Sequence, residues 1–159
     1  MKHAVRDEAR SIEVIARAVI EDQGRLLLCQ NKKQGYLYLP GGHVEAGESA
    51  AEAAVRELAE ECGVEISGLE PVAISEERFE QRGIPRHELN LVFHVKHARD
   101  GAGPLKHTRP VQSLEHDISF RWIARQHLSQ EDIRPSSLAR WLLDDPSPTV
   151  SWVSSEQSV

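Results

Sequence analysis

Cysteine is scarce in this chain: only 2 of its 159 residues are cysteines. Cys29 and Cys62 both stand in apolar stretches of the sequence, where a buried reduced thiol is more common than a disulfide. The chain is therefore not expected to be a disulfide-stabilised scaffold, and it is long enough for one domain with a core of its own. Reduced thiols are typical of a cytoplasmic protein.

Long apolar runs are also missing. No stretch approaches the roughly 20 residues that an apolar helix needs to cross a bilayer, and the charged segment Met1–Ser11 lacks the apolar region of a signal peptide. We therefore expect a cytoplasmic protein with no membrane partner. The oligomeric state stays open, with a homodimer as one alternative.

An excess of basic residues is the third absence. The chain has 19 Lys and Arg against 25 Asp and Glu, a formal net charge of −6. Binding to long nucleic acid needs a basic surface, so this class of partner is not expected. A small phosphorylated substrate is not excluded, because bound metal ions and a few local cations can reverse the field inside an acidic pocket.

The most informative segment that is present is Gly42–Val64, which reads GHVEAGESAAEAAVRELAEECGV. It contains a long spaced pattern made of Gly42, Glu48, Arg56, Glu57, Leu58, Glu60, Glu61, Gly63 and Val64. Seven fixed identities at about 7% usage each, with two apolar positions, should coincide by chance on the order of 10⁻⁹ per starting point. The pattern is therefore highly specific.

The same segment predicts a helix with three neighbouring carboxylates. Ser49 opens a Ser-x-x-Glu capping pair, and Gly63 is a natural helix stop. At 3.6 residues per turn, Glu60 and Glu61 fall roughly 60° and 40° to either side of Glu57. An arc of small and apolar residues adjoins these acids, made of Ala51, Ala54, Val55, Leu58 and Cys62. Carboxylates crowded beside a core face repel one another, and a hard divalent cation such as Mg²⁺ relieves that repulsion.

At every specified position the pattern resembles the signature of the Nudix hydrolases. The resemblance implies hydrolysis of a nucleoside diphosphate linked to another group, by attack of water at phosphorus. It also implies a metal site made of the backbone carbonyl of Gly42 and the carboxylates of Glu57, Glu60 and Glu61, which would hold Mg²⁺, with Mn²⁺ as a substitute. Metal ions neutralise phosphate oxygens and lower the pKa of the attacking water.

Within that resemblance the residues take different roles. Glu60 and Glu61 are the principal metal ligands, and Glu61 is also counted among the catalytic residues. Glu57 is either a ligand or the base that activates water. The planar fork of Arg56 suits holding one of these carboxylates in place. Glu48 precedes the helix and is expected to brace the loop or to serve as an outer ligand.

Many Nudix proteins recruit one further acid from a loop just before the last strand. Here the segment 113–117 precedes the expected strand 120–123, as that loop would. Glu115 is the preferred catalytic acid in this loop, and Asp117 is the alternative. The identity of the general base therefore stays open among Glu57, Glu115 and Asp117.

Cations that could contact phosphate are Arg17, Arg25, Lys32 and Lys33. Arg17 stands out because it interrupts an apolar strand, although a solvated charge is the default for each of them. The signatures of particular Nudix subfamilies are not clear in this chain. Its substrate therefore stays open between a nucleoside triphosphate and a nucleotide sugar such as ADP-ribose.

The remaining pattern predicts an α/β fold. Apolar alternation predicts strands at 12–20, 25–29, 36–39, 72–79, 88–97 and 120–123, a second helix at 135–143, and connections at 65–71 and 99–114. This order suggests a mixed β-sheet between helices, and the resemblance implies the Nudix-type α/β/α sandwich. We expect one Nudix domain over residues 1–145 and a frayed Ser- and Pro-rich tail over 146–159.

A second class of function is a catalytically inactive Nudix-fold protein that binds nucleotides as a sensor or scaffold. Such proteins usually lose a glutamate of the motif or gain a DNA-binding domain. This chain retains every acid of the motif and shows neither a second domain nor a basic stretch. The sequence therefore favours the enzyme.

Overall fold

The computed structural model describes residues 11–144 and 149–154. Its larger sheet has six strands, in the order β10-β6-β7-β1-β5, with β8 paired to β7. These strands are β1 (Ile12–Val19), β5 (Gly41–His43), β6 (Glu65–Gln81), β7 (Ile84–Asp100), β8 (Gly103–Pro104) and β10 (Ser151–Ser154). Strand β1 runs parallel to β7 and antiparallel to β5, so the sheet is mixed, as expected.

A second sheet of four strands packs beside the first, with β2, β3 and β4 in order and β9 on β3. Its strands are β2 (Glu21–Asp22), β3 (Arg25–Asn31), β4 (Leu37–Tyr38) and β9 (Ile118–Ala124). Gln23 and Gly24, which both have positive φ, form the turn between β2 and β3. The helices are α2 (Ala50–Cys62), α3 (Ser136–Leu143) and the short 3₁₀ helix η1 (Arg125–Gln130).

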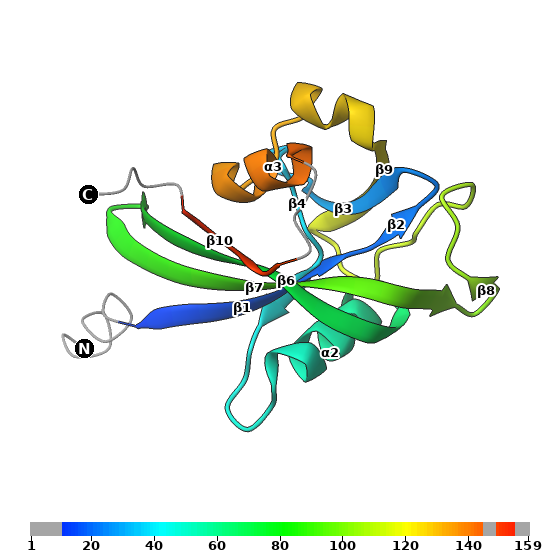
Figure 1. Ribbon diagram of the computed structural model, residues 1–159, viewed down its shortest axis with the longest axis horizontal. Helices are drawn as coiled ribbons and strands as arrows, with labels where there is room; N and C mark the ends of the chain where they lie inside the picture. Colours follow the sequence, from blue (N-terminus) through cyan, green and yellow to red (C-terminus); the bar gives the residue numbers. More distant parts are fainter. Residues whose placement is uncertain (1–10, 145–148, 155–159) are drawn as a thin grey trace.

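Helices α2 and α3 lie on opposite sides of the larger sheet (Figure 1). Strand β1 packs against both helices, because its alternate side chains point to opposite faces of the sheet. Ala16 and Ala18 pack in the core that contains Leu58 of α2, whereas Val19 packs in the core that contains Leu138 of α3. The α/β sandwich with a mixed sheet is therefore confirmed.

Helix α2 begins and ends where the sequence predicts. Ser49 accepts a hydrogen bond from the backbone of Glu52, and the Glu52 side chain accepts one from the backbone of Ser49. Gly63 ends the helix at φ 67°, and its N–H donates to the carbonyl of Ala59. One detail differs: Val55, expected in the apolar arc, is 39% exposed.

The expected connection at 65–71 is wrong, because β6 already begins at Glu65 and pairs with β7 there. Gly68 and Pro71 are strand breakers in the sequence, but the structure accommodates both. Gly68 takes a φ of 67° where the Lys96 side chain lies close, and the register of the pair shifts between Pro71 and Ala73. Such a bulge tolerates proline, which has no N–H to donate.

The chain's end also differs from the expectation of a frayed tail. Ser151–Ser154 forms β10, a parallel edge strand on β6, with Ser151 opposite Ala73. The rest of the expected tail, 146–148 and 155–159, lies outside the described residues, and Thr149 and Val150 precede β10. Among the helices of the described ranges, none is long and apolar enough to cross a membrane.

Candidate active site

Arg56 is the central cation of the predicted site. Its Nε and Nη2 donate to the two carboxylate oxygens of Glu48 at 3.1 and 2.7 Å. Its Nη1 donates to Glu57 at 2.9 Å and to Glu60 at 3.2 Å, and its Nη2 also reaches the carbonyl of His43 at 3.0 Å. The guanidinium therefore holds three carboxylates and a backbone carbonyl in one arrangement, where the sequence predicted one carboxylate. These partners raise the pKa of Arg56, led by the hydrogen bond to Glu48.

Glu48 has the bracing position expected of it. Besides Arg56, its carboxylate accepts a hydrogen bond from the backbone of Glu45 at 2.8 Å. These contacts lower the pKa of Glu48, first of all through Arg56. Glu48 thus ties the loop before α2 to the helix.

The three motif carboxylates differ in burial. The side chains of Glu57 and Glu60 are 18% and 58% exposed, whereas Glu61 is 6% exposed and lies in the buried face of α2. Burial, with the neighbouring charge of Glu57, raises the pKa of Glu61 to about 7. The Oε2 atom of Glu61 is buried without a hydrogen-bond partner. The helix therefore presents one desolvated carboxylate beside two more accessible ones.

Two glycines allow the loop between β4 and α2 to approach the helix. A side chain at Gly42 would overlap the carboxylate of Glu57, and a side chain at Gly41 would overlap the carbonyl of Ala16. Gly41 has a φ of 134° and donates its backbone N–H to Glu61. The structure therefore brings Gly42 together with the carboxylates of α2, as the resemblance implied.

The loop before β9 reaches the same place. The N–H of Leu114 donates to the carbonyl of Glu61 at 2.7 Å, and the charge of Glu115 helps to raise the pKa of Glu61. The alternative acid, Asp117, is 91% exposed and pairs with His116. The contact of Leu114 and the charge of Glu115 thus favour Glu115 over Asp117 as the acid of this loop that acts on Glu61.

Arg17 is the site residue that sequence reasoning undervalued. The default of a solvated charge is wrong for it, because desolvation by burial lowers its pKa. It donates to Asn90, to Leu39 and to Gly41, and its guanidinium lies 5.3 Å from the ring centre of Tyr38. The available signal was the interruption of an apolar strand by one arginine.

The donor set fits a hard divalent cation. Carboxylate and carbonyl oxygens are the ligands that Mg²⁺ prefers, and the unpaired Oε2 of Glu61 lies within a cluster of like charges. In the described part of the chain, no three His, Cys, Asp or Glu side chains are already gathered as a complete metal site. Arg56 forms ion pairs with both Glu57 and Glu60 in this arrangement.

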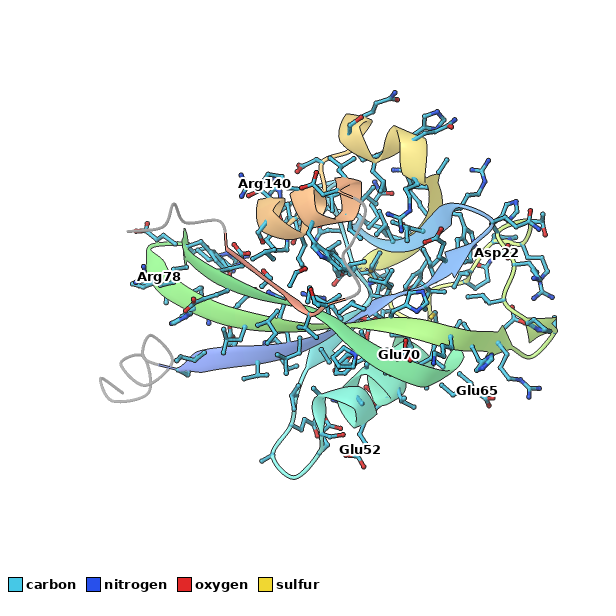
Figure 2. The ribbon with its side chains drawn as sticks, viewed as in Figure 1. Asp22, Glu52, Glu65, Glu70, Arg78 and Arg140 are labelled. Carbon is cyan, nitrogen blue, oxygen red and sulfur yellow. The ribbon has the colours of Figure 1, made fainter. Side chains whose placement is uncertain are left out.

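A hollow of about 650 Å³ lies elsewhere, between β2, the start of β6 and the ends of β7 and β8. Asp22 and Glu65, which line it, mark its place at the β8 end of the molecule (Figure 2). None of the predicted site residues lines it. The hollow and the carboxylate cluster thus lie in different places. The carboxylate cluster is the stronger candidate for catalysis, because groups with shifted pKa values gather at active sites.

Known proteins resemble this chain over most of its length. The model of the NUDIX domain family matches residues 10–142. The chain belongs to the Nudix family. A Nudix chain of this kind is a hydrolase that acts on phosphorus-containing acid anhydrides. It is 34% identical over 133 residues to the CTP pyrophosphohydrolase of Escherichia coli (strain K12), covering 81% of this chain and 87% of that protein.

Two further relatives bear on this Nudix chain. It is 38% identical over 85 residues to the ADP-ribose pyrophosphatase of Methanocaldococcus jannaschii, covering 50% of this chain and 48% of that protein. Its fold is similar to that of the MutT protein from Bacillus halodurans, with a TM-score of 0.67 and 19% identity, covering 87% of this chain and 88% of the other. The second similarity concerns the fold alone.

Proposed function

We propose that this Nudix hydrolase is a Mg²⁺-dependent enzyme that cleaves a phosphoanhydride bond of a small nucleotide by attack of water at phosphorus. The observation that carries the proposal is the buried, unpaired carboxylate oxygen of Glu61 beside Glu57. A buried anion among other anions is costly unless a cation is added. The carboxylates of the motif are therefore better suited to binding a metal ion with its substrate than to stabilising the metal-free fold.

The proposed roles follow from the geometry. Glu57, Glu60, Glu61 and the carbonyl of Gly42 would hold the cation, which neutralises phosphate oxygens and lowers the pKa of the attacking water when it is bound. Arg56 orients Glu57 and Glu60 through its Nη1. Glu115 is the proposed base, because its loop is anchored to the helix at the carbonyl of Glu61. Glu57 is the alternative base.

A nucleoside triphosphate is the proposed substrate, with a nucleotide sugar such as ADP-ribose as the alternative. The similarity to the CTP pyrophosphohydrolase extends over 87% of that protein, whereas the similarity to the ADP-ribose pyrophosphatase covers 48% of its length. The longer match includes the loop before β9 and favours the triphosphate. Manganese is the proposed substitute for magnesium, because it accepts the same oxygen ligands.

A panel of nucleotides tests this function. The purified chain is incubated with Mg²⁺ and each of the ribo- and deoxyribonucleoside triphosphates, ADP-ribose and a nucleotide sugar, and the phosphate products are measured. We expect turnover of a triphosphate with release of pyrophosphate. A chain that binds nucleotides tightly but hydrolyses none of them would instead be the inactive sensor or scaffold.

A cytoplasmic location and a homodimer are also proposed for this chain. Cys29 and Cys62 are free thiols in the structure, which supports the proposed cytoplasmic location because that compartment keeps thiols reduced. A homodimer stays a prediction that sedimentation of the purified chain can test.

A further inference from the structure

Arg17 is held from two directions by groups that carry no charge. Its Nε donates to Oδ1 of Asn90 on β7 at 3.1 Å. Its Nη1 donates to the carbonyl of Leu39 at 3.1 Å and to that of Gly41 at 3.4 Å. None of these bonds goes to a carboxylate. The carboxylates of Glu88 and Glu61 act on Arg17 through their charge, without a hydrogen bond to it. A guanidinium whose hydrogen-bond partners are neutral still has a donor to offer to an anion.

The second amino group of Arg17, Nη2, makes no hydrogen bond to any described residue. It is not among the polar atoms that are both buried and unpaired, so solvent reaches it. Tyr38 stands beside the guanidinium at 5.3 Å and restricts its movement. Arg17 thus presents one open pair of N–H donors from a fixed position.

The backbone position of Arg17 adjoins the carboxylate site. Arg17 is directly opposite Gly41 in the pairing of β1 with β5. The carbonyl of Gly41 accepts a hydrogen bond from Arg17, and the N–H of Gly41 donates one to Glu61. Arg17 and Glu61 are therefore separated by a single glycine, next to Gly42 and Glu57. A phosphate bound at the proposed cation would lie within the same small region.

We propose that Arg17 is a substrate-binding residue, whose Nη2 donates to a non-bridging phosphate oxygen of the substrate. The buried position matters, because a guanidinium already fixed by Asn90 and Leu39 loses little further freedom when the phosphate binds. Asn90 is completely buried and acts as the positioning residue of Arg17. This inference rests on the proposed function, in that it assumes a substrate with a phosphoanhydride.

Inorganic tripolyphosphate is the probe, because it carries the phosphoanhydride without a nucleoside. Isothermal calorimetry at constant Mg²⁺ compares the wild type with Arg17→Met, Arg17→Lys and the control Arg140→Met, whose arginine is exposed on α3. We expect Arg17→Met to weaken tripolyphosphate binding about 10- to 100-fold, as for a lost hydrogen bond to a charged group. Arg17→Lys should recover part of the affinity, and Arg140→Met should bind tripolyphosphate as tightly as the wild type.

A merely structural Arg17 would give a different result. Arg17→Met would then melt at a lower temperature, but its folded form would bind tripolyphosphate within about two-fold of the wild type. That outcome would overturn the proposal, as would a wild-type chain without affinity for tripolyphosphate. The nucleotide panel tests the proposed function separately. If Arg17→Met loses tripolyphosphate binding but the wild type hydrolyses no nucleotide, the proposed function is wrong and the role of Arg17 in phosphate binding still holds.

A second measurement applies if Arg17→Met does not fold. In wild-type chain labelled with ¹⁵N at arginine, the Arg17 side-chain resonance is assigned by its absence from the spectrum of Arg17→Lys. We expect this resonance to shift on addition of tripolyphosphate, while that of Arg140 stays in place. An unshifted Arg17 resonance at saturating tripolyphosphate would contradict direct contact.

Discussion

Single residues of α2 that look alike in the sequence have different chemistry in the fold. Glu57 and Glu60 are bound by Arg56, whereas Glu61 is buried with one oxygen unpaired. A negative charge at Glu61 is therefore the most expensive of the three in the absence of a cation, and the same charge is the most strongly stabilised when a cation arrives. The predictions for single residues follow from this difference.

The change Glu61→Gln is expected to remove most turnover while preserving the fold. It deletes the charge and keeps the shape, so the proposed cation loses a ligand. We expect kcat for the best nucleotide of the panel to fall roughly 10²- to 10⁴-fold. A kcat close to that of the wild type would refute the role. Glu76→Gln, on β6 outside the site, is the matched control.

The raised pKa of Glu61 also predicts how the stability of the metal-free protein depends on pH. A folded-state pKa of about 7, above the ordinary 4.5, means that folding favours the protonated carboxyl. This contribution is fully present below about pH 4.5 and is lost as the pH rises through about 7. It amounts to about 3 kcal/mol at most. Urea unfolding in chelator at pH 5 and pH 8 should show a smaller difference for Glu61→Gln than for the wild type.

The loop acids allow a direct comparison of two neighbouring residues. Glu115→Gln should lower kcat with little effect on the melting temperature, because an exposed loop side chain contributes little packing. Asp117→Asn should leave both nearly unchanged, since Asp117 pairs only with the exposed His116. If Asp117→Asn reduces turnover and Glu115→Gln does not, the two assignments are exchanged. If neither matters, Glu57 becomes the leading base.

At the scale of elements, α2 is set in place by its two ends. The capping box at Ser49 and the left-handed Gly63 fix where the helix begins and stops. Between them, Leu58 and Ala54 pack on the sheet, which turns Glu61 inward. The loop at Gly42 and the loop at Leu114 then contact this same helix. One element therefore carries every proposed carboxylate ligand of the metal.

Loss of the helix cap should affect stability more than chemistry. Ser49→Ala removes the side-chain acceptor for the backbone of Glu52, and we expect a loss of about 1 kcal/mol in the free energy of unfolding. Because the first turn is remote from Glu61, kcat should change less than two-fold in the folded enzyme. Denaturant unfolding measures the loss of stability and steady-state kinetics measures kcat. Ser67→Ala, at an exposed serine, is the control. A large loss of kcat at full stability would show that the cap shapes the site.

The whole molecule is organised around the meeting point of its two sheets. Strand β1 contributes Arg17, β4 contributes Tyr38, and β5 contributes Gly41 and Gly42. Helix α2 supplies the acids from the side of the larger sheet that faces away from α3 (Figure 1). A cation bound there would link elements from both sheets and the helix. Its binding should therefore stabilise the molecule as a unit.

Addition of Mg²⁺ should raise the melting temperature of the wild type at pH 8. A ligand that binds only the folded chain adds about 2.7 kcal/mol at 100 times its dissociation constant, or a shift of several degrees for a chain of this size. Glu61→Gln should show little of this shift, and excess chelator should reverse it and abolish turnover. Full turnover in excess chelator would disprove metal dependence.

The sequence by itself determined α2 with both caps, the cluster of three carboxylates and the Nudix family, because these features depend on residues close together in the chain. Local spacing fixes a helix and the side chains that share its face. It also located most strands through their alternation, although Gly68 and Pro71 disguised the start of β6.

Only the tertiary structure decided which of the acids is buried and what surrounds it. The burial of Glu61 depends on the packing of α2 against β1, and the place of Glu115 depends on a hydrogen bond from Leu114 to the distant Glu61. Arg17 changes from a surface charge to a fixed donor because Asn90 and Leu39 converge on it from other strands. Burial and charge coupling depend on contacts between segments far apart in the chain, so these properties exist only once the sheets have assembled.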